Sequence, residues 1–258
     1  TLVRKKAAQA TKKAVLYVHG FADYFFQKEM AEQFNQHGYD FYALDLRKYG
    51  RSKLPHQTLY YVRDLREYDA EISKTLEIIS QENHNQVLLA GHSTGGLITT
   101  LYAAHYPDHR LVKALWANSP FYDFFKSIIE KKMGIPLLSE FGKRFPNAKF
   151  PSGLNPWYVP SLHKKFHGEW EFNLEWKPES MPFVQLCFVH AIHEAQKEIH
   201  KGITLNIPTL IMHSHQSKYP KKWGIDAQQS DVILDVKDMT NNAKKMKGDI
   251  QTLSVHNG

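Results

Sequence analysis

Cysteine is nearly absent from this chain, since Cys187 is the only one among 258 residues. A single cysteine excludes an internal disulfide, and this composition fits a reducing compartment. We therefore expect a cytoplasmic protein that is held together by its core.

Long apolar runs are missing as well. No stretch of about 18 apolar residues occurs, which argues against a membrane-spanning helix. The first residues, Thr1–Lys6, do not resemble a signal peptide, although the chain starts without methionine and a leader could have been removed. Internal repeats and low-complexity tracts are also absent.

Acidic residues are outnumbered, because 26 Asp and Glu face 33 Lys and Arg, giving a net charge of +7. An excess of positive charge can mark nucleic-acid binding. Here the charge is dispersed in doublets such as Lys131-Lys132 and Lys244-Lys245, without a nucleic-acid motif. We expect a solvated basic surface, no nucleic-acid partner, and at most a weak peripheral attraction to anionic lipid. The sequence carries no signal for oligomeric state.

The amino-acid composition and the length indicate a globular protein. Apolar residues make up 42% and aromatic residues 13%, which is enough for a sizeable core. The length suits one α/β domain with an insertion and is too short for two catalytic domains.

Strand-like and helix-like patterns alternate along the chain. We expect strands at 12–19, 40–46, 87–90, 111–117, 207–212 and 250–255, with a further strand possible at 1–6. Helical spacing covers 29–37, 64–79, the residues after 94, and 237–247. This alternation predicts a mostly parallel, doubly wound sheet, whose ligands bind at the carboxyl ends of the strands.

The alternation breaks between residues 121 and 203, a stretch rich in aromatic residues, proline and glycine with one helix expected near 183–200. We therefore expect a core of residues 1–120 and 204–258, interrupted by an insertion of residues 121–203. Most of the aromatic side chains in the insertion should pack its own core.

The pattern Gly91-His92-Ser93-Thr94-Gly95 lies between an apolar strand and a helical periodicity. In that context G-x-S-x-G predicts a sharp strand-to-helix turn, which lifts the Ser93 hydroxyl clear of the sheet. Gly91 and Gly95 leave room for the turn, and we expect His92 to pack rather than to act as a base. A plain Gly/Ser loop is the alternative.

A second motif, His19-Gly20-Phe21, follows the strand at 12–19. Together with residues 91–96 it resembles the monoacylglycerol lipase and lysophospholipase branch of the α/β-hydrolases, which is also grouped with serine aminopeptidases. The resemblance implies an α/β-hydrolase fold, a cap formed by the insertion, Ser93 as nucleophile, and the backbone amides of Phe21 and Thr94 as oxyanion donors. His19 and Gly20 support them.

Two further stretches resemble the same family. Residues 47–52 resemble a family turn that supports the elbow, and a simple tight turn is equally consistent with them. Asp231-Val-Ile-Leu-Asp235 resembles the stretch that carries the catalytic acid, which implies Asp231, with Asp226 and Asp235 as capping or solvated alternatives.

The catalytic histidine should follow the last strand in a turn that Asn257-Gly258 resembles. We expect it just after Gly258, with His256, or else His215, as the fallback. By this expectation the closing helix is also missing and the chain is trimmed at its carboxyl end, with the first strand as a second candidate for trimming.

A metal site is the remaining chemical alternative. His190, His193 and Glu194 share one helical face, and His213 and His215 end a strand, but neither group has the spacing of a known zinc motif. We expect no metal and no cofactor.

The sequence therefore predicts a serine hydrolase that cleaves carboxylic esters through an acyl-enzyme, with lysophospholipids or monoacylglycerols as the substrate class that the resemblance implies. Two rivals stay open. One is a peptidase or amidase on the same fold, and the other is a non-catalytic binding protein that keeps the fold.

Overall fold

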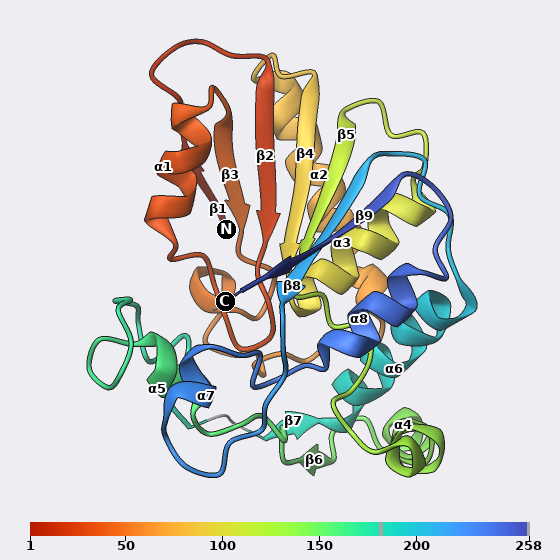
Figure 1. Cartoon of the computed structure of the whole chain (residues 1–258). Helices are drawn as coiled ribbons and strands as arrows, with labels where there is room; N and C mark the ends of the chain where they lie inside the picture. Colours follow the sequence, from red (N-terminus) through yellow and green to blue (C-terminus); the bar gives the residue numbers. More distant parts are fainter. Residues whose placement is uncertain (181–182, 257–258) are drawn as a thin grey trace.

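A mixed sheet of seven strands forms the centre of the computed structural model, which describes residues 1–180 and 183–256 (Figure 1). The strands are β1 (Leu2–Lys5), β2 (Lys13–Val18), β3 (Asp40–Leu44), β4 (Gln86–His92), β5 (Val112–Asn118), β8 (Thr209–Ser214) and β9 (Ile250–Val255). Their order is β1-β3-β2-β4-β5-β8-β9, and only β1 runs antiparallel to its neighbour. The predicted mostly parallel sheet is confirmed.

Alternate residues of the central strands serve two apolar layers, as the period of a strand requires. In β2, Leu16 and Val18 pack into the main core, whereas Val15 and Tyr17 pack with Ala31 of α1 (Lys28–Gln36) on the opposite face. Both layers are closed to water, which explains why β2 is a continuous apolar run rather than an alternating one.

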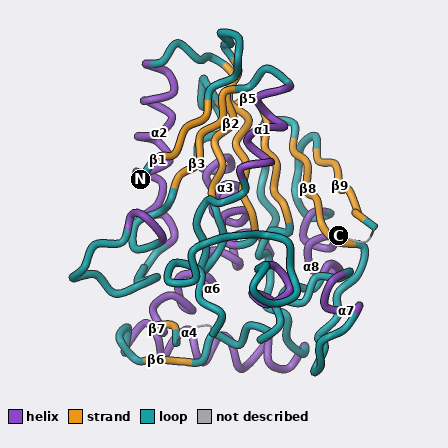
Figure 2. The backbone as a smooth tube through the Cα atoms, turned by 90° about the vertical axis from the view of Figure 1, so that its left-hand side faces the viewer, coloured by secondary structure: helices purple, strands orange, loops and turns teal. Residues whose placement is uncertain are grey.

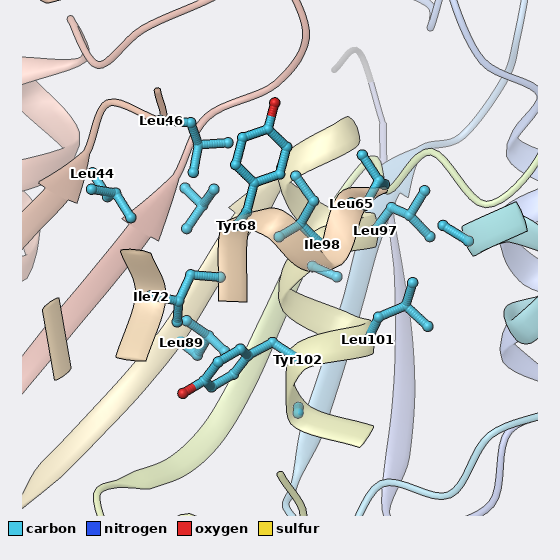
Figure 3. Close-up of a cluster of buried hydrophobic side chains, with 14 of the residues drawn as sticks. Leu44, Leu46, Leu65, Tyr68, Ile72, Leu89, Leu97, Ile98, Leu101 and Tyr102 are labelled. Atoms are coloured by element: carbon cyan, nitrogen blue, oxygen red, sulfur yellow. The ribbon is translucent and has the colours of Figure 1, made fainter. Parts of the chain in front are cut away.

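The main core lies between the sheet and helices α2 (Asp69–Gln81), α3 (Thr94–His105) and α6 (Leu186–Lys201). Figure 3 shows Ile72 of α2, Leu89 of β4, and Leu97, Ile98 and Leu101 of α3, which all belong to this layer. Each such side chain gains about 1.5–3 kcal/mol from full burial. The predicted helix from Asp64 begins as a 3₁₀ turn, η2 (Leu65–Tyr68), which Asp64 and Glu67 close with a capping box.

Between β5 and β8, residues 119–180 and 183–208 add no strand to this sheet. They contain η3 (Glu130–Gly134), α4 (Ile135–Arg144), α5 (Tyr158–Leu162) and α6, and their strands β6 (Lys149–Phe150) and β7 (Val184–Gln185) pair only with each other. In both views α4, β6 and β7 lie beyond the carboxyl ends of the central strands (Figures 1 and 2). No helix in the described ranges is long and apolar enough to cross a membrane.

The return to the sheet after β8 passes through a long loop with one short helix, α7 (Ile225–Gln228). Residues 231–235 form no strand, because Asp231 makes a single bridge to Ser217, and Asp235 caps α8 (Val236–Ala243). The loop therefore brings Asp231 back over the carboxyl edge of the sheet before α8 and β9 complete the fold.

Helix α3 lies very close to the sheet at Gly95, where a Cβ atom would stand 2.3 Å from the carbonyl oxygen of Val18. We expect Gly95→Ala to lower the free energy of unfolding by about 3 kcal/mol, because backbone on both sides cannot yield. Gly134→Ala is the matched control, since its nearest neighbour would be Glu130 Cβ at 3.9 Å, and alanine favours a helix by up to about 1 kcal/mol. Urea denaturation of both variants checks this, and equal stabilities would contradict it.

Candidate functional site

Ser93 lies at the turn where β4 ends and α3 begins, with the left-handed backbone angles φ 55° and ψ −119°. A non-glycine residue there costs about 1–3 kcal/mol and must be held by its surroundings. The Ser93 amide donates to Asn118 O at 3.0 Å, and its carbonyl accepts from Leu97 N at 3.1 Å and Phe121 N at 3.0 Å. The strained turn is thus fixed by β5, by α3 and by the start of the insertion.

Close packing brings the loop after β2 against this turn. A Cβ atom on Gly20 would stand 3.1 Å from Ser93 Cβ, and one on Gly91 would stand 2.4 Å from Gly95 O. The two glycine-containing motifs of the sequence therefore meet in space.

His19 shapes the loop rather than reaching for Ser93. Its buried ring donates from Nδ1 to Gly20 O at 2.8 Å, and its Nε2 accepts from Leu46 N at 3.0 Å. Burial lowers the pKa of His19, although Asp23 and Asp45 partly oppose this, so the ring is neutral and this tautomer is fixed. The ring thereby holds the turn that leads into Phe21.

Two backbone amides, one at the turn and one in the loop after β2, are candidate donors to a ligand. The amide of Phe21 donates to no residue in the described ranges, and the amide of Thr94 belongs to the first turn of α3, where intrahelical partners are lacking. Phe21, Ser93 and Thr94 all line the same cavity. The arrangement can hold an anionic oxygen beside the serine.

The loop at residues 47–52 supports His19 through the preceding strand end. Asp45 is fully buried and accepts from the amides of Phe25 and Arg51 and from Arg51 Nη1 at 2.8 Å. The Tyr49 ring lies 5.0 Å from the His19 ring. This network fixes Leu46, whose amide holds His19 in place.

The cavity above Ser93 has a volume of about 970 Å³. The insertion contributes much of its apolar wall through Phe121, Phe124, Tyr158, Trp170, Phe188 and Ile192. A volume of this size with an apolar lining suits a ligand larger than a short acyl group.

Asp231 lines the same cavity from the loop after β8. Its Oδ1 accepts from the amides of Ile233 at 2.9 Å and Leu234 at 2.7 Å. Burial raises the pKa of Asp231, and these two amides partly oppose the rise. Asp235 instead caps α8 through the Lys237 amide, and neither Asp226 nor Asp235 is among the described lining residues.

No histidine in residues 1–180 and 183–256 hydrogen-bonds the Ser93 hydroxyl. His213 lines the cavity, but its Nδ1 donates to Ser214 O at 2.6 Å and its Nε2 lies 3.2 Å from Thr240 Oγ1. The rings of His215 and His256 stack on each other at 5.0 Å. The turn expected at residues 257–258 lies outside the described residues.

Two of the residues considered for a metal site have other partners. His190 Nδ1 lies 2.9 Å from Ser139 Oγ, and Glu194 pairs with Lys197 at 2.9 Å. Within the described part of the chain, no three His, Cys, Asp or Glu side chains are grouped as metal ligands.

One polar cluster near the site could not be predicted from the sequence. Lys177 Nζ lies 3.1 Å from Asp23 Oδ1, and both side chains are buried. The two residues are far apart in the chain and match no motif, so only the folded structure brings them together.

His92 is enclosed beside this cluster, and burial lowers its pKa from the ordinary 6.5 to about 4. The unfolded chain therefore binds a proton more readily than the folded protein between these pH values. Stability must fall as the pH drops from 7 toward 4, by about 2 kcal/mol from pH 7 to pH 5 for this one group.

We expect His92→Asn to remove that part of the pH dependence, because its side chain stays neutral. The measurement is the free energy of unfolding in urea at pH 7 and pH 5. Replacement of the exposed His56 by Asn is the control and should keep the full wild-type loss. A His92→Asn protein that loses as much stability as the wild type would contradict the assignment.

Comparison with known proteins places these features in a family. The profile of the family described as serine aminopeptidase, S33, matches residues 9–222. Among curated proteins, epoxide hydrolase 4 of Mus musculus is 29% identical over 147 residues, covering 56% of this chain and 39% of that protein. Probable lysophospholipase L2 of Haemophilus influenzae is 31% identical over 137 residues, covering 52% and 43%. The matched part is thus about two fifths of the length of these relatives.

Solved structures resemble almost the whole chain. A soluble variant of monoglyceride lipase from Saccharomyces cerevisiae, in complex with a substrate analogue, superposes with a TM-score of 0.71 at 18% identity, covering 99% of this chain and 80% of that one. Monoacylglycerol lipase of Paleococcus ferrophilus gives 0.72 at 19% identity, covering 99% and 88%. At such identities the likeness establishes the fold. With the family profile spanning most of its length, this chain belongs to the family described as serine aminopeptidase, S33, and it has the α/β-hydrolase fold.

Proposed function

We propose that this protein is a serine hydrolase that cleaves carboxylic esters through an acyl-enzyme. The observation that carries the proposal is the strained turn at Ser93, which opens into an apolar cavity shared with Phe21, Thr94 and Asp231. A nucleophile, two oxyanion donors and an acid are the parts that acyl transfer needs.

In the proposed reaction the Ser93 oxygen attacks the ester carbonyl carbon while a histidine base takes the hydroxyl proton. The amides of Phe21 and Thr94 stabilise the resulting oxyanion, each donor being worth about 2.7–4 kcal/mol in enzymes where it has been removed. The carbon–oxygen bond to the alcohol then breaks, and the base returns the proton to the leaving alkoxide. Water, activated by the same base, releases the acid and restores Ser93.

Asp231 is the proposed acid that orients the base. Two backbone amides hold its Oδ1, and the described residues place no hydrogen-bond donor on its Oδ2. That oxygen can accept the N–H of an imidazole and fix its tautomer.

The base is proposed to come from the chain directly after β9. Val255, the last residue of β9, lines the cavity, so the backbone leaves the sheet at the rim of the site. His256 and a histidine that follows Gly258 are the two candidates.

We further propose that residues 121–203 act as a cap and that the substrate is a monoacylglycerol or lysophospholipid. The apolar cavity wall supplied by the insertion supports an acyl chain, and relatives with these activities in their names support the class. Amide hydrolysis uses the same groups and is the rival activity.

The single cysteine, Cys187, is consistent with the cytoplasm as the compartment.

Ser93→Ala should abolish labelling by a fluorophosphonate and lower ester turnover by on the order of 10³-fold or more.

Asp231→Asn should lower turnover by about 10⁴-fold, because an amide favours the wrong imidazole tautomer. The matched control is Asp235→Asn, since asparagine caps a helix as well as aspartate does. A fluorogenic acyl ester assayed beside aminoacyl amides measures all three, and faster turnover of the amides would favour the rival.

The base is tested in the same assay by His256→Ala. Loss of labelling would identify His256, whereas unchanged labelling would place the base elsewhere. His213→Ala and His215→Ala then serve as comparisons, and loss in either of them alone would overturn a base after β9.

An exposed apolar surface on the insertion supports a lipid contact. One side of α4 packs on α6, where a Cβ on Gly142 would stand 2.3 Å from Leu186 O. Its other side and the preceding turn form the surface that we call the α4 face, whose exposed members are Ile128, Ile129, Met133, Leu137, Phe141 and Phe145.

The charge around the α4 face indicates what it contacts. Exposed basic residues flank it, namely Lys126, Lys132, Lys143, Arg144 and Lys149. Leu137 is 74% exposed and Met133 70% exposed, and together with their neighbours they form a contiguous exposed apolar surface of the kind that marks an interaction site. Glu130 pairs with Lys126 and Glu140 with Arg144, which leaves Lys132, Lys143 and Lys149 as the excess of positive charge. Apolar side chains beside an excess of lysine match the surface of an anionic bilayer, and we propose this as the occupant.

The triple variant Leu137→Ser, Phe141→Ser and Phe145→Ser should bind phosphatidylcholine–phosphatidylserine vesicles at least about tenfold more weakly, because apolar area no longer enters the bilayer. Turnover of a water-soluble short ester should stay unchanged. Leu253→Ser, on the exposed edge strand β9, is the control. Vesicle sedimentation measures binding, and full binding by the triple variant would refute the α4 face as the contact.

A further inference from the structure

Lys177 and Asp23 form an ion pair that is closed to water. The side chains are 1% and 2% exposed, and Lys177 Nζ lies 3.1 Å from Asp23 Oδ1. Burial alone would lower the pKa of Lys177, but Asp23 and Tyr158 outweigh it and hold the pKa above its ordinary value. The lysine is therefore charged in the interior.

The pair joins two parts of the chain that differ in role. Asp23 stands two residues after Phe21, whose amide is a proposed oxyanion donor. Lys177 belongs to the insertion, where its ammonium also donates to Tyr158 Oη at 3.3 Å and lies 4.7 Å from the centre of that ring. Tyr158, at the start of α5, lines the cavity.

Further contacts tie the same two segments together. The amide of Asn173 donates to Tyr24 Oη at 2.6 Å, and Tyr24 packs with Phe172 and Val159 of the insertion. The Tyr24 ring meets Trp176 edge-on at 5.1 Å. The insertion thus packs against and hydrogen-bonds the residues that directly follow Phe21.

The segment in contact with the insertion, residues 22–24, contains a residue with a strained backbone. Ala22, between Phe21 and Asp23, has φ 48° and is fully buried. A non-glycine residue keeps such a conformation only where its neighbours impose it. On the Asp23 side the constraint is visible, because the carboxylate holds its own backbone through the Tyr24 amide at 2.9 Å and is itself held by Lys177.

Stability alone does not account for a buried pair of this kind. Replacing such a pair by apolar side chains of similar volume is often neutral or stabilising, whereas removing one partner leaves an uncompensated charge. An ion pair is directional, so it can fix the position of a neighbouring backbone, which apolar side chains would do less well.

We propose that Lys177 is a positioning residue for the oxyanion hole. By holding Asp23 it holds the strained turn at Ala22, and so it sets the direction of the Phe21 amide from the insertion side. The inference rests on the proposed function of Phe21. It means that the oxyanion hole is complete only while the α5 part of the insertion is docked on the loop after β2.

The test compares wild type with Lys177→Met and with the double variant Asp23→Asn, Lys177→Met. The double variant removes both charges, so it should unfold near the wild-type temperature even where the single variant is destabilised. A charge pair on the surface of the same insertion, Lys164 and Glu171, is 3.2 Å apart and supplies the control Lys164→Met, Glu171→Gln.

In the double variant we expect kcat for an acyl ester to fall about 10- to 100-fold with little change in KM, because a misdirected donor loses part of its effect on the transition state. The preference for an ester over its thionoester should shrink, because sulfur already accepts poorly from the oxyanion donors. A merely structural role would leave that ratio unchanged.

Hydrogen exchange of residues 19–26 provides a readout that needs no turnover. It should be faster in the double variant than in wild type and unchanged in the surface control. Wild-type exchange in this segment, or a wild-type kcat and ester preference in a folded double variant, would overturn the inference. A wild-type protein with no ester hydrolysis and no labelling of Ser93 would instead overturn the proposed function, while the exchange result would still decide whether Lys177 holds the loop.

Discussion

The left-handed backbone of Ser93 is the constraint on which the rest of the site depends. The unfavourable backbone conformation is offset by hydrogen bonds from three elements to the two peptide groups of the turn. These elements are β5 through Asn118, α3 through Leu97 and the insertion through Phe121. With α3 starting one residue later, the helix must cross β2 so closely that Gly95 has no room for a side chain. The turn, the helix and the sheet are therefore placed together, and none of them can shift without the others.

The parallel sheet then determines what meets Ser93. Parallel strands end at one edge, so the loop after β2 arrives with Phe21, the loop after β8 with Asp231, and β9 with Val255. Residues that are far apart in the chain therefore meet at one edge of the sheet. The loop after β2 is held by the two hydrogen bonds of the His19 ring, and the loop after β8 is held by the bridge between Asp231 and Ser217.

Much of this could be predicted from the sequence, because the relevant signals are local. The apolar run before Gly91, the two flanking glycines and the helical spacing after Thr94 predict the strand, the turn and the helix from adjacent residues. The same logic predicted a helix from Asp64, and the capping box is present, but the first turn is 3₁₀ rather than α. The bounds of an element depend on packing that local patterns do not contain.

Other features could not be predicted, because they join residues distant in the chain. No pattern links Asp23 to Lys177, and none shows that His213 would be engaged by Ser214 and Thr240. Resemblance pointed to Asp231, but only the folded loop shows that Asp235 caps α8 while Asp231 reaches the cavity. These contacts arise from the insertion and the long loop after β8, where the hydrophobic period is weak.

The insertion is attached to the core in two physically different ways, and this bears on how a ligand reaches Ser93. Its α6 part is continuous with the main core, since Phe188 and Ile192 pack in the same apolar layer as Leu97. Its α5 part is held by the buried pair of Lys177 and Asp23. Opening the cavity on the α5 side would separate two charges in apolar surroundings, at a cost of several kcal/mol.

On the α4 side the connection is both ionic and apolar. Lys131 of η3 reaches Asp123 at 3.2 Å and also contacts Asp238. Helix α4 packs so closely on α6 that a Cβ on Gly142 would stand 2.3 Å from Leu186 O. Displacing α4 would therefore break close packing against a helix of the main core. The two parts of the insertion are thus held by different interactions, and a substitution that weakens one of them should leave the other in place.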